Sequence, residues 1–208
     1  MISVYNLKKN FQNILRPLSD YMFKIGITAN MVTITAFILS VVVGFGLFYL
    51  SSCSSLFFLI MPIFLFVRMA LNAIDGMLAR EHNQKSNIGA IYNELGDILS
   101  DCALYVPLFI VLGVDHYLIM VFIVLCIVSE TVGIIGCQIN ASRHYEGPMG
   151  KSDRAFYIGT LCTVLAFYSI DVLYLQIFVG IVSLLLIYTT VNRVRGELKE
   201  VAKQDKEL

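Results

Sequence analysis

The chain has 208 residues, of which 58% are hydrophobic and 14% charged, and its mean hydropathy is +0.77. This composition is too apolar for a water-soluble domain and indicates a protein embedded in a lipid bilayer. Fifteen basic residues balance fifteen acidic ones, so no nucleic-acid partner is expected, because such a partner needs a basic excess. The five cysteines show no CxxC or Cys/His spacing, which argues against a zinc site.

The first part of the chain, residues 1–27, is apolar on one side only. Its apolar residues recur at close to the helical period, with polar and basic residues between them. This pattern predicts an amphipathic helix that lies in the membrane interface. Pro17 falls inside the pattern, so we expect the helix to be kinked or divided there.

Six apolar segments follow, and a membrane-spanning helix needs about 20 residues. They are residues 31–50, 56–71, 88–112, 117–139, 155–170 and 172–188. Thr28 and Asn30 are suitable N-cap residues for the first segment. The predicted fold class is therefore all-α integral membrane, with six transmembrane helices after the interfacial helix. We expect one domain over residues 1–208, with the six-helix bundle at 28–195 and a cytoplasmic tail at 196–208.

The basic residues predict how these segments are oriented. Lys and Arg flank the start of the first segment, the second and fourth connections and the end of the sixth segment, whereas residues 51–55, 113–116 and 171 include none. Cytoplasmic flanks of membrane helices collect basic residues. Six spans with both termini in the cytoplasm are therefore predicted.

A polar cluster interrupts the cytoplasmic ends of the second and third segments. It consists of Asn72 and Asp75 on one helix, and Asn93, Asp97 and Asp101 on the next. Their spacing places each set near one helix face, and ionisable residues inside membrane helices indicate function. Oxygen ligands without His or Cys suit Mg²⁺, Mn²⁺ or Ca²⁺. A structural pairing of Asp97 and Asp101 with an arginine such as Arg68 or Arg80 is the alternative.

Residues with little side-chain bulk accompany the acids. For Ala90 and Gly96, close helix packing is as good an interpretation as a binding role. For Gly76, Ala79 and Gly89, beside the acidic face, we expect clearance for a flat or bulky ligand.

This pattern resembles the signature of the CDP-alcohol phosphatidyltransferases, D-x2-D-G-x2-A-R-x8-G-x3-D-x3-D, with every spacing kept between residues 72 and 97. The matching positions are Asn72, Asp75, Gly76, Ala79, Arg80, Gly89, Asn93 and Asp97. Residues 27–30 resemble the I-T-P-N entry of that family to its first span. Residues 68–105 look most similar to its YnbA-type inner-membrane members. The resemblance implies a bacterial inner-membrane protein and a homodimer.

The resemblance also implies a reaction in which a polar alcohol displaces CMP from a CDP-linked lipid such as CDP-diacylglycerol, with Mg²⁺ or Mn²⁺, in phospholipid biosynthesis. Asp97 matches the last aspartate of the signature, so the resemblance implies that it is the general base. The expected metal-binding residues are Asn72, Asp75, Asn93, Asp97 and Asp101. The expected nucleotide-binding residues are Asp75, Gly76, Ala79, Arg80 and Gly89.

Two amides stand where the family has carboxylates. Asn72 and Asn93 replace the first and third aspartates of the signature, which removes two negative charges. Ligand charge helps set the affinity of hard-cation sites. We therefore expect one tightly held divalent ion with the second weak or absent, or two weakly held ions with Asp101 or Glu94 assisting.

The acceptor side is marked by Lys151 and Arg154, which resemble elements of family members that take phosphorylated acceptors. Ammonium and guanidinium groups bind phosphate well, so a phosphorylated polyol is the first expectation, and ordinary flanking charge is an equally good interpretation. Glu130, within the fourth segment, either lines the cavity or satisfies a neighbouring hydroxyl.

Two other functions remain open on the sequence alone. A catalytically weak or silent CDP-lipid-binding protein of the same fold is favoured by the two asparagines. A small transporter or channel also explains acidic residues in the membrane, but it does not require the Gly-x2-Ala-Arg spacing.

Overall fold

The structure is a computed structural model that describes residues 4–144 and 147–207. This part of the chain is helical throughout and includes no strand. Its elements are α1 (Val4–Lys24), α2 (Ala29–Leu50), the 3-10 helix η1 (Ser55–Leu59), α3 (Ile60–Glu81), α4 (Asn87–Val111), α5 (His116–Gln138), α6 (Lys151–Phe167) and α7 (Val172–Glu207). Residues 1–3 of the predicted interfacial helix and residue 208 of the predicted tail lie outside the described residues.

All six apolar segments form helices, with shifted boundaries. Thr28 caps α2, because its hydroxyl accepts a hydrogen bond from the Met31 N–H at 3.3 Å, whereas Asn30 lies inside the helix. The second segment begins as η1 and continues as α3 through the polar cluster to Glu81. The mixed charges of residues 197–208 are typical of either a solvated helix or a tail, and the structure shows the helix, because α7 continues unbroken to Glu207 and is 36 residues long.

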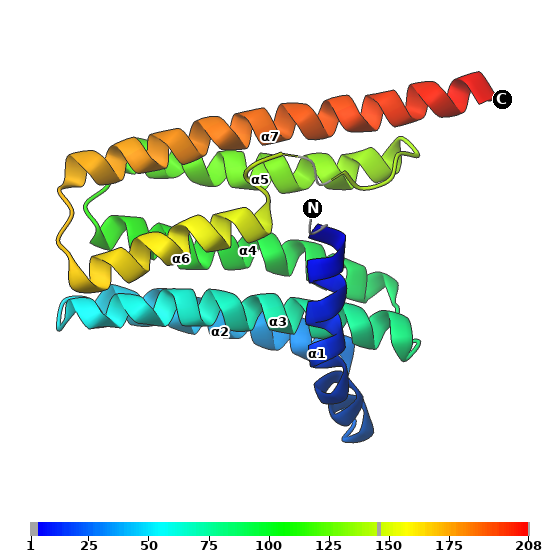
Figure 1. The fold of residues 1–208 in the computed structure, drawn as a ribbon, viewed down its shortest axis with the longest axis horizontal. Coiled ribbons are helices and arrows are strands. Elements are labelled where there is room, and N and C mark those ends of the chain that lie inside the picture. The colour runs from blue at the N-terminus through cyan, green and yellow to red at the C-terminus, as the bar shows by residue number, and fades with distance from the viewer. Residues whose placement is uncertain (1–3, 145–146, 208) are drawn as a thin grey trace.

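The α1 helix crosses the other helices at a steep angle (Figure 1) and packs against α3. It runs through Pro17 as one helix, so the alternative of two shorter helices was wrong. Contacts on both sides of the proline fix it to the end of α3 and the residue after it. The Arg16 guanidinium donates two hydrogen bonds of 3.1 Å to Glu81, and Asp20 lies 3.0 Å from His82.

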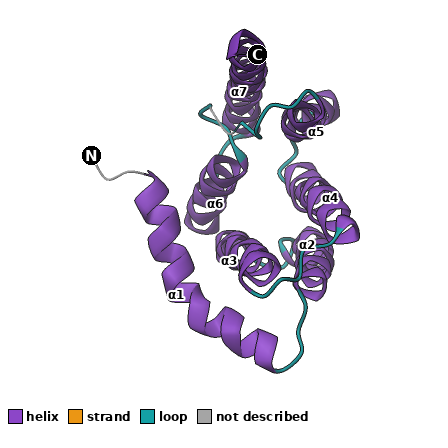
Figure 2. Cartoon of the chain, turned by 90° about the vertical axis from the view of Figure 1, so that its right-hand side faces the viewer, coloured by secondary structure: helices purple, strands orange, loops and turns teal. Residues whose placement is uncertain are grey.

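The helices α2 to α7 run side by side, and Figure 2 shows them end-on. The α2 helix packs against both α3 and α4, while α6 packs on α3, α5 on α4, and α7 on α5. Within the described residues, the backbones of α3 and α4 make no close contact of their own. The space between these two helices is bridged by polar side chains, as described below.

The closest helix packing is between α2 and α4. A Cβ atom added to Gly44 would lie 1.9 Å from the carbonyl oxygen of Ala103. A hydrophobic core that includes Leu47, Leu104 and Leu108 continues this contact. The α2 and α4 helices therefore form a tight pair that carries one side of the polar cluster.

Four stretches of the described chain are long and apolar enough to cross a membrane. They are Ala29–Leu50, Ser55–Glu81, His116–Gln138 and Val172–Lys206. The α4 helix carries three acidic residues, and α6 has only 17 residues, so neither has the length and composition of these four. Of the six predicted spans, four are thus supported directly by the length and composition of their helices.

Candidate active site

Asp75 is a buried carboxylate on α3. One of its oxygens accepts a hydrogen bond of 2.8 Å from the hydroxyl of Thr33 on α2. Asp97 and Lys151 lie close enough for their charges to act on Asp75. Three helices and the first residue of a fourth therefore meet around this carboxylate.

Asp97 is the point where the polar faces of α3 and α4 meet. Its Oδ1 atom accepts a hydrogen bond of 3.0 Å from the Asn72 amide and forms an ion pair with the Lys151 ammonium. Its main-chain oxygen accepts a bond of 3.0 Å from Arg68. The expected meeting of the two polar helix faces is shown by the hydrogen bond between Asn72 and Asp97, with Lys151 as an additional cation between α4 and α6.

Asp101, one helical turn further along α4, is enclosed by arginines. Arg68 donates to its Oδ1 atom, and Arg154 donates to its Oδ2 atom at 2.8 and 3.2 Å. All three side chains are buried. Of the two interpretations open from the sequence, the structure shows the pairing with arginine for this residue.

Glu130 on α5 is the centre of a second buried group. Its Oε1 atom accepts a bond of 3.0 Å from Arg154 and lies 3.7 Å from Arg193, and its Oε2 atom accepts a bond of 3.1 Å from Arg143. Arg143 also pairs with Glu94 on α4. Glu130 therefore satisfies neither of the expected roles, because its partners are arginines instead of a hydroxyl or an open cavity.

Arg143 and Arg193 are site residues that the sequence patterns did not predict. The signal that could have found them is Glu130 itself, since an acid in the middle of an apolar helix requires a cationic partner. In the sequence alone, positions 143 and 193 look like ordinary flanking basic residues.

The small residues do not all leave open space. The guanidinium of Arg80 covers Gly76. A Cβ atom added to Gly76 would lie 3.0 Å from a terminal nitrogen of Arg80. At Gly89, a Cβ atom would come within 2.5 Å of the Asn30 side chain and 2.8 Å of the Ser86 hydroxyl, so this glycine serves helix packing. Ala79 and Asn93 are half-buried, and Ala90 is exposed.

Four of the expected metal-binding residues could offer oxygen atoms to a hard cation. Asp75 and Asp97 provide two carboxylates, and the amides of Asn72 and Asn93 provide neutral oxygens. Within residues 4–144 and 147–207, no group of three His, Cys, Asp or Glu side chains gathers closely enough to hold a metal ion. The oxygens of Asp101 are already bonded to arginines.

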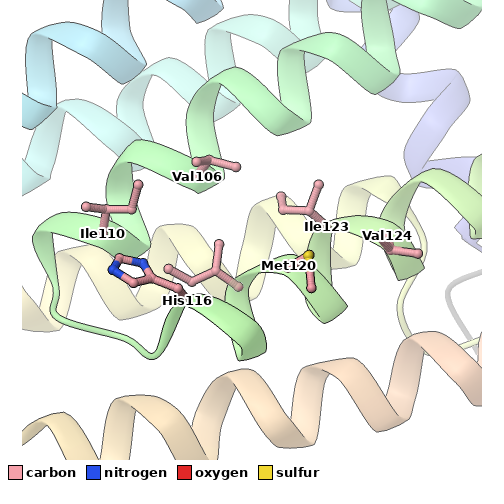
Figure 3. A pocket seen from close by; sticks show the side chains of 7 residues that line it. Val106, Ile110, His116, Met120, Ile123 and Val124 are labelled. Atoms are coloured by element: carbon pink, nitrogen blue, oxygen red, sulfur yellow. The ribbon is translucent and has the colours of Figure 1, made fainter.

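Two surface recesses of the described chain differ in how near they lie to the polar cluster. Figure 3 shows an apolar recess between α4 and α5, lined by residues such as Ile110, His116 and Met120, in the half of the bundle away from Asp97. The other lies between α3 and α6, from Pro62 and Leu65 to Ser152 and Phe156. Because Ser152 follows Lys151, this apolar groove begins beside the cluster.

The comparisons with known proteins agree with this geometry. The sequence profile described as CDP-alcohol phosphatidyltransferase matches residues 26–192. The inner membrane protein YnbA of Escherichia coli (strain K12) is 40% identical over 197 residues, which cover 95% of this chain and 97% of that protein.

Solved structures of phosphatidylinositol phosphate synthase (PgsA1) from Mycobacterium tuberculosis share the fold. The structure with CDP-DAG bound has a TM-score of 0.72 at 19% identity, covering 89% of this chain and 94% of that one. The structure in complex with manganese and citrate has a TM-score of 0.71 at 18% identity, with 88% of each chain covered. The match of the family profile to most of the chain and the identity with YnbA place the chain in the CDP-alcohol phosphatidyltransferase family.

Proposed function

We propose that this protein transfers a phosphatidyl group from a CDP-linked lipid, such as CDP-diacylglycerol, to a polar alcohol and releases CMP. The observation that carries the proposal is the meeting of Asn72, Asp75, Asp97 and Lys151 at one end of the bundle. Family membership supports the reaction class, and a structure with the same fold binds CDP-DAG.

In this proposal Asp97 is the general base. The oxygen of the alcohol attacks the phosphorus of the phosphatidyl group, the bond between that phosphorus and the oxygen of CMP breaks, and Asp97 takes the hydroxyl proton. Asn72 and Lys151 both bond to Oδ1 of Asp97 and thereby fix the orientation of the carboxylate.

Asp75 and Asp97, together with the amide oxygens of Asn72 and Asn93, would hold one Mg²⁺ or Mn²⁺ ion. Such an ion supplies positive charge to the pyrophosphate and the leaving CMP. We propose that Asp101 and Glu94 position arginines and do not bind metal, because their carboxylates pair with Arg154 and Arg143. The nucleotide would contact the surface of Gly76, Ala79 and Arg80, while Gly89 would act indirectly by letting the start of α4 pack closely on α2.

The groove between α3 and α6 suits the lipid part of the substrate. Its lining is mostly apolar, and it begins next to Lys151. We propose that an acyl chain lies in this groove while the pyrophosphate reaches the polar cluster. Lys151 would lie between the lipid and the alcohol, and Arg154, about one turn further along α6, would mark the direction from which the alcohol enters.

We further propose six membrane spans, with α4 and α6 as the two additional ones, in a bacterial inner membrane with both termini in the cytoplasm. The related YnbA is an inner membrane protein, and α4 and α6 run alongside the four apolar helices (Figures 1 and 2). A 17-residue helix is about 26 Å long, slightly less than a bilayer core of about 30 Å. A single domain over residues 1–208 and a homodimer remain predictions.

The test of this function is CMP release from CDP-diacylglycerol by purified protein with Mg²⁺ and a panel of alcohols. Asp97→Asn should lower the rate by roughly a hundredfold or more, because the base is lost. Asp115→Asn is the control, since Asp115 caps α5 at the opposite end of the bundle and asparagine caps equally well. Undiminished CMP release by folded Asp97→Asn protein would contradict the proposal.

A further inference from the structure

The arginines on the acceptor side are each paired with at least one carboxylate. We define the arginine–glutamate cluster as Arg143, Arg154, Arg193, Glu94 and Glu130. Both oxygens of Glu130 are bonded to arginines, and Arg143 has Glu94 as a second partner. Glu130, Arg154 and Arg193 are only 6%, 0% and 2% exposed. The pairs of Glu130 with Arg154 and Arg193 therefore lie inside the bundle, where solvent does not screen them, whereas the Arg143–Glu94 pair is partly exposed.

A phosphate group on the acceptor would have to displace Glu130 from this cluster. Binding of phosphate by guanidinium requires free N–H groups that point toward the anion. In the described residues those groups of Arg154 and Arg143 point at Glu130, Glu94 and the neighbouring Asp101. A dianion beside these carboxylates would also be repelled by them.

Lys151 offers no free charge for phosphate either. Its ammonium is paired with Asp97, the proposed base. A phosphate that captured Lys151 would leave Asp97 without its cationic partner. Both residues that the sequence assigned to a phosphorylated acceptor, Lys151 and Arg154, are thus committed to carboxylates.

The buried groups that lack a partner suit hydroxyls instead. The Nε atom of Arg193 and the Oγ atom of Ser129 are buried and form no hydrogen bond within the described residues. The two residues are adjacent, since Arg193 donates a bond of 2.6 Å to the main-chain oxygen of Ser129. A hydroxyl both donates and accepts hydrogen bonds, so it can satisfy single donors and carboxylate oxygens without adding charge.

We infer that the acceptor is a polyhydroxy alcohol without a phosphate group, and that Glu130 determines this specificity. This inference rests on the proposed transfer reaction and narrows its acceptor. It replaces the phosphorylated polyol that the sequence suggested. Glu130 acts by occupying the guanidinium groups that would otherwise bind phosphate.

Binding of sn-glycerol 3-phosphate to the full-length protein in detergent tests the inference. Isothermal titration is performed with Mg²⁺ and saturating CDP, so that phosphate cannot enter through the nucleotide side. We expect no saturable binding by the wild-type protein up to roughly 10 mM. Glu130→Gln keeps the shape of the side chain and removes its charge, and it should bind the ligand at least about tenfold more tightly.

Matched variants control the experiment. Glu81→Gln also replaces a glutamate by glutamine on the same side of the bundle, and it leaves the exposed Arg16 without the carboxylate of Glu81. This variant should bind no glycerol 3-phosphate. Glu94→Gln removes one partner of Arg143 at a less buried position and should gain binding in the same direction as Glu130→Gln. If the Glu130 variant does not fold, the Glu94 variant and the wild-type protein decide the result.

Saturable binding by the wild-type protein with a Kd below about 10 mM would overturn the inference. Folded Glu130→Gln protein that binds no more tightly than wild type would overturn the role of Glu130. A second measurement compares CMP release with glycerol or myo-inositol against their phosphate esters, and we expect wild-type preference for the unphosphorylated alcohols. Loss of CMP release with every alcohol would contradict the transfer reaction, while the titration would still test the inference.

Discussion

Asp97 has a cation of its own in Lys151. The ammonium is paired with Oδ1, the oxygen that also accepts the Asn72 amide. A divalent ion that binds at Asp97 must therefore share this carboxylate with a fixed positive charge. If positions 72 and 93 bind metal as proposed, this arrangement complements the amides found there, since a site with fewer negative charges needs fewer bound cations.

Replacement of Lys151 should accordingly strengthen metal binding. Lys151→Met keeps most of the side-chain length and removes the charge, so we expect the affinity for Mn²⁺ to rise about tenfold, with one ion bound per chain. Isothermal titration of the detergent-solubilised protein measures both quantities. Lys199→Met, at an exposed position on α7, should leave the affinity within about twofold. An unchanged affinity in the Lys151 variant, or two tight ions in wild type, would show the prediction to be wrong.

At the level of single residues, the sequence predicted which residues form the motif better than it predicted the side chains to which those residues bond. Local spacing was sufficient to predict that Asn72 and Asp97 share a site, and their hydrogen bond confirms the proximity. The bonds of Arg154 to Asp101 and Glu130 join α4, α5 and α6. They depend on how each helix is rotated about its axis, and spacing along one helix does not determine that rotation.

The pair formed by α2 and α4 shows what holds neighbouring elements together. Gly44 brings the backbone of α2 against the carbonyl of Ala103 on α4, where no side chain can move aside. A Cβ atom added to Gly46, two residues later, would meet nothing within 4 Å. The two glycines of one helix therefore have opposite tolerances for substitution.

Gly44→Ala should destabilise the protein by about 1–3 kcal/mol, because the added methyl group forces the two helices apart. Gly46→Ala should leave stability unchanged or raise it by up to about 1 kcal/mol, since alanine favours helix over glycine. Thermal unfolding of both variants in the same detergent measures the difference. Equal melting temperatures for the two variants would contradict the close contact at Gly44.

Hydrophobic periodicity predicted the order and type of the helices but not all of their ends. It indicated the six apolar helices, yet α7 runs on to Glu207 because its polar turns still pack against other elements. Glu200 on this extension accepts hydrogen bonds from the main chain and hydroxyl of Ser142, at 3.1 and 2.7 Å, and lies 2.8 Å from His144. Such contacts between distant segments cannot be read from local composition.

At the scale of the whole molecule, the cysteines give a test of orientation. Cys53 is exposed in the turn between α2 and η1, and Cys137 is exposed at the opposite end of the bundle, near the end of α5. With both termini in the cytoplasm, Cys53 faces the outside and Cys137 the inside. The other three cysteines are less exposed.

A membrane-impermeant maleimide should therefore label Cys53 in intact spheroplasts and Cys137 only after the membrane is permeabilised. Cys53→Ser and Cys137→Ser assign the labelled position by mass spectrometry. Labelling of Cys137 in intact spheroplasts, with Cys53 protected, would mean the reverse orientation. The orientation stays a prediction from the placement of basic residues, which reflects membrane insertion and needs no knowledge of packing.

The length of α7 has a practical consequence. Its 36 residues measure about 54 Å, whereas the hydrocarbon core of a bilayer is about 30 Å thick, so several turns continue past the lipid as one rigid rod. A small globular reporter joined in helical register at its end would turn with the bundle and not swing on a tether. Such a fusion would give particle images of this small protein a visible landmark for alignment.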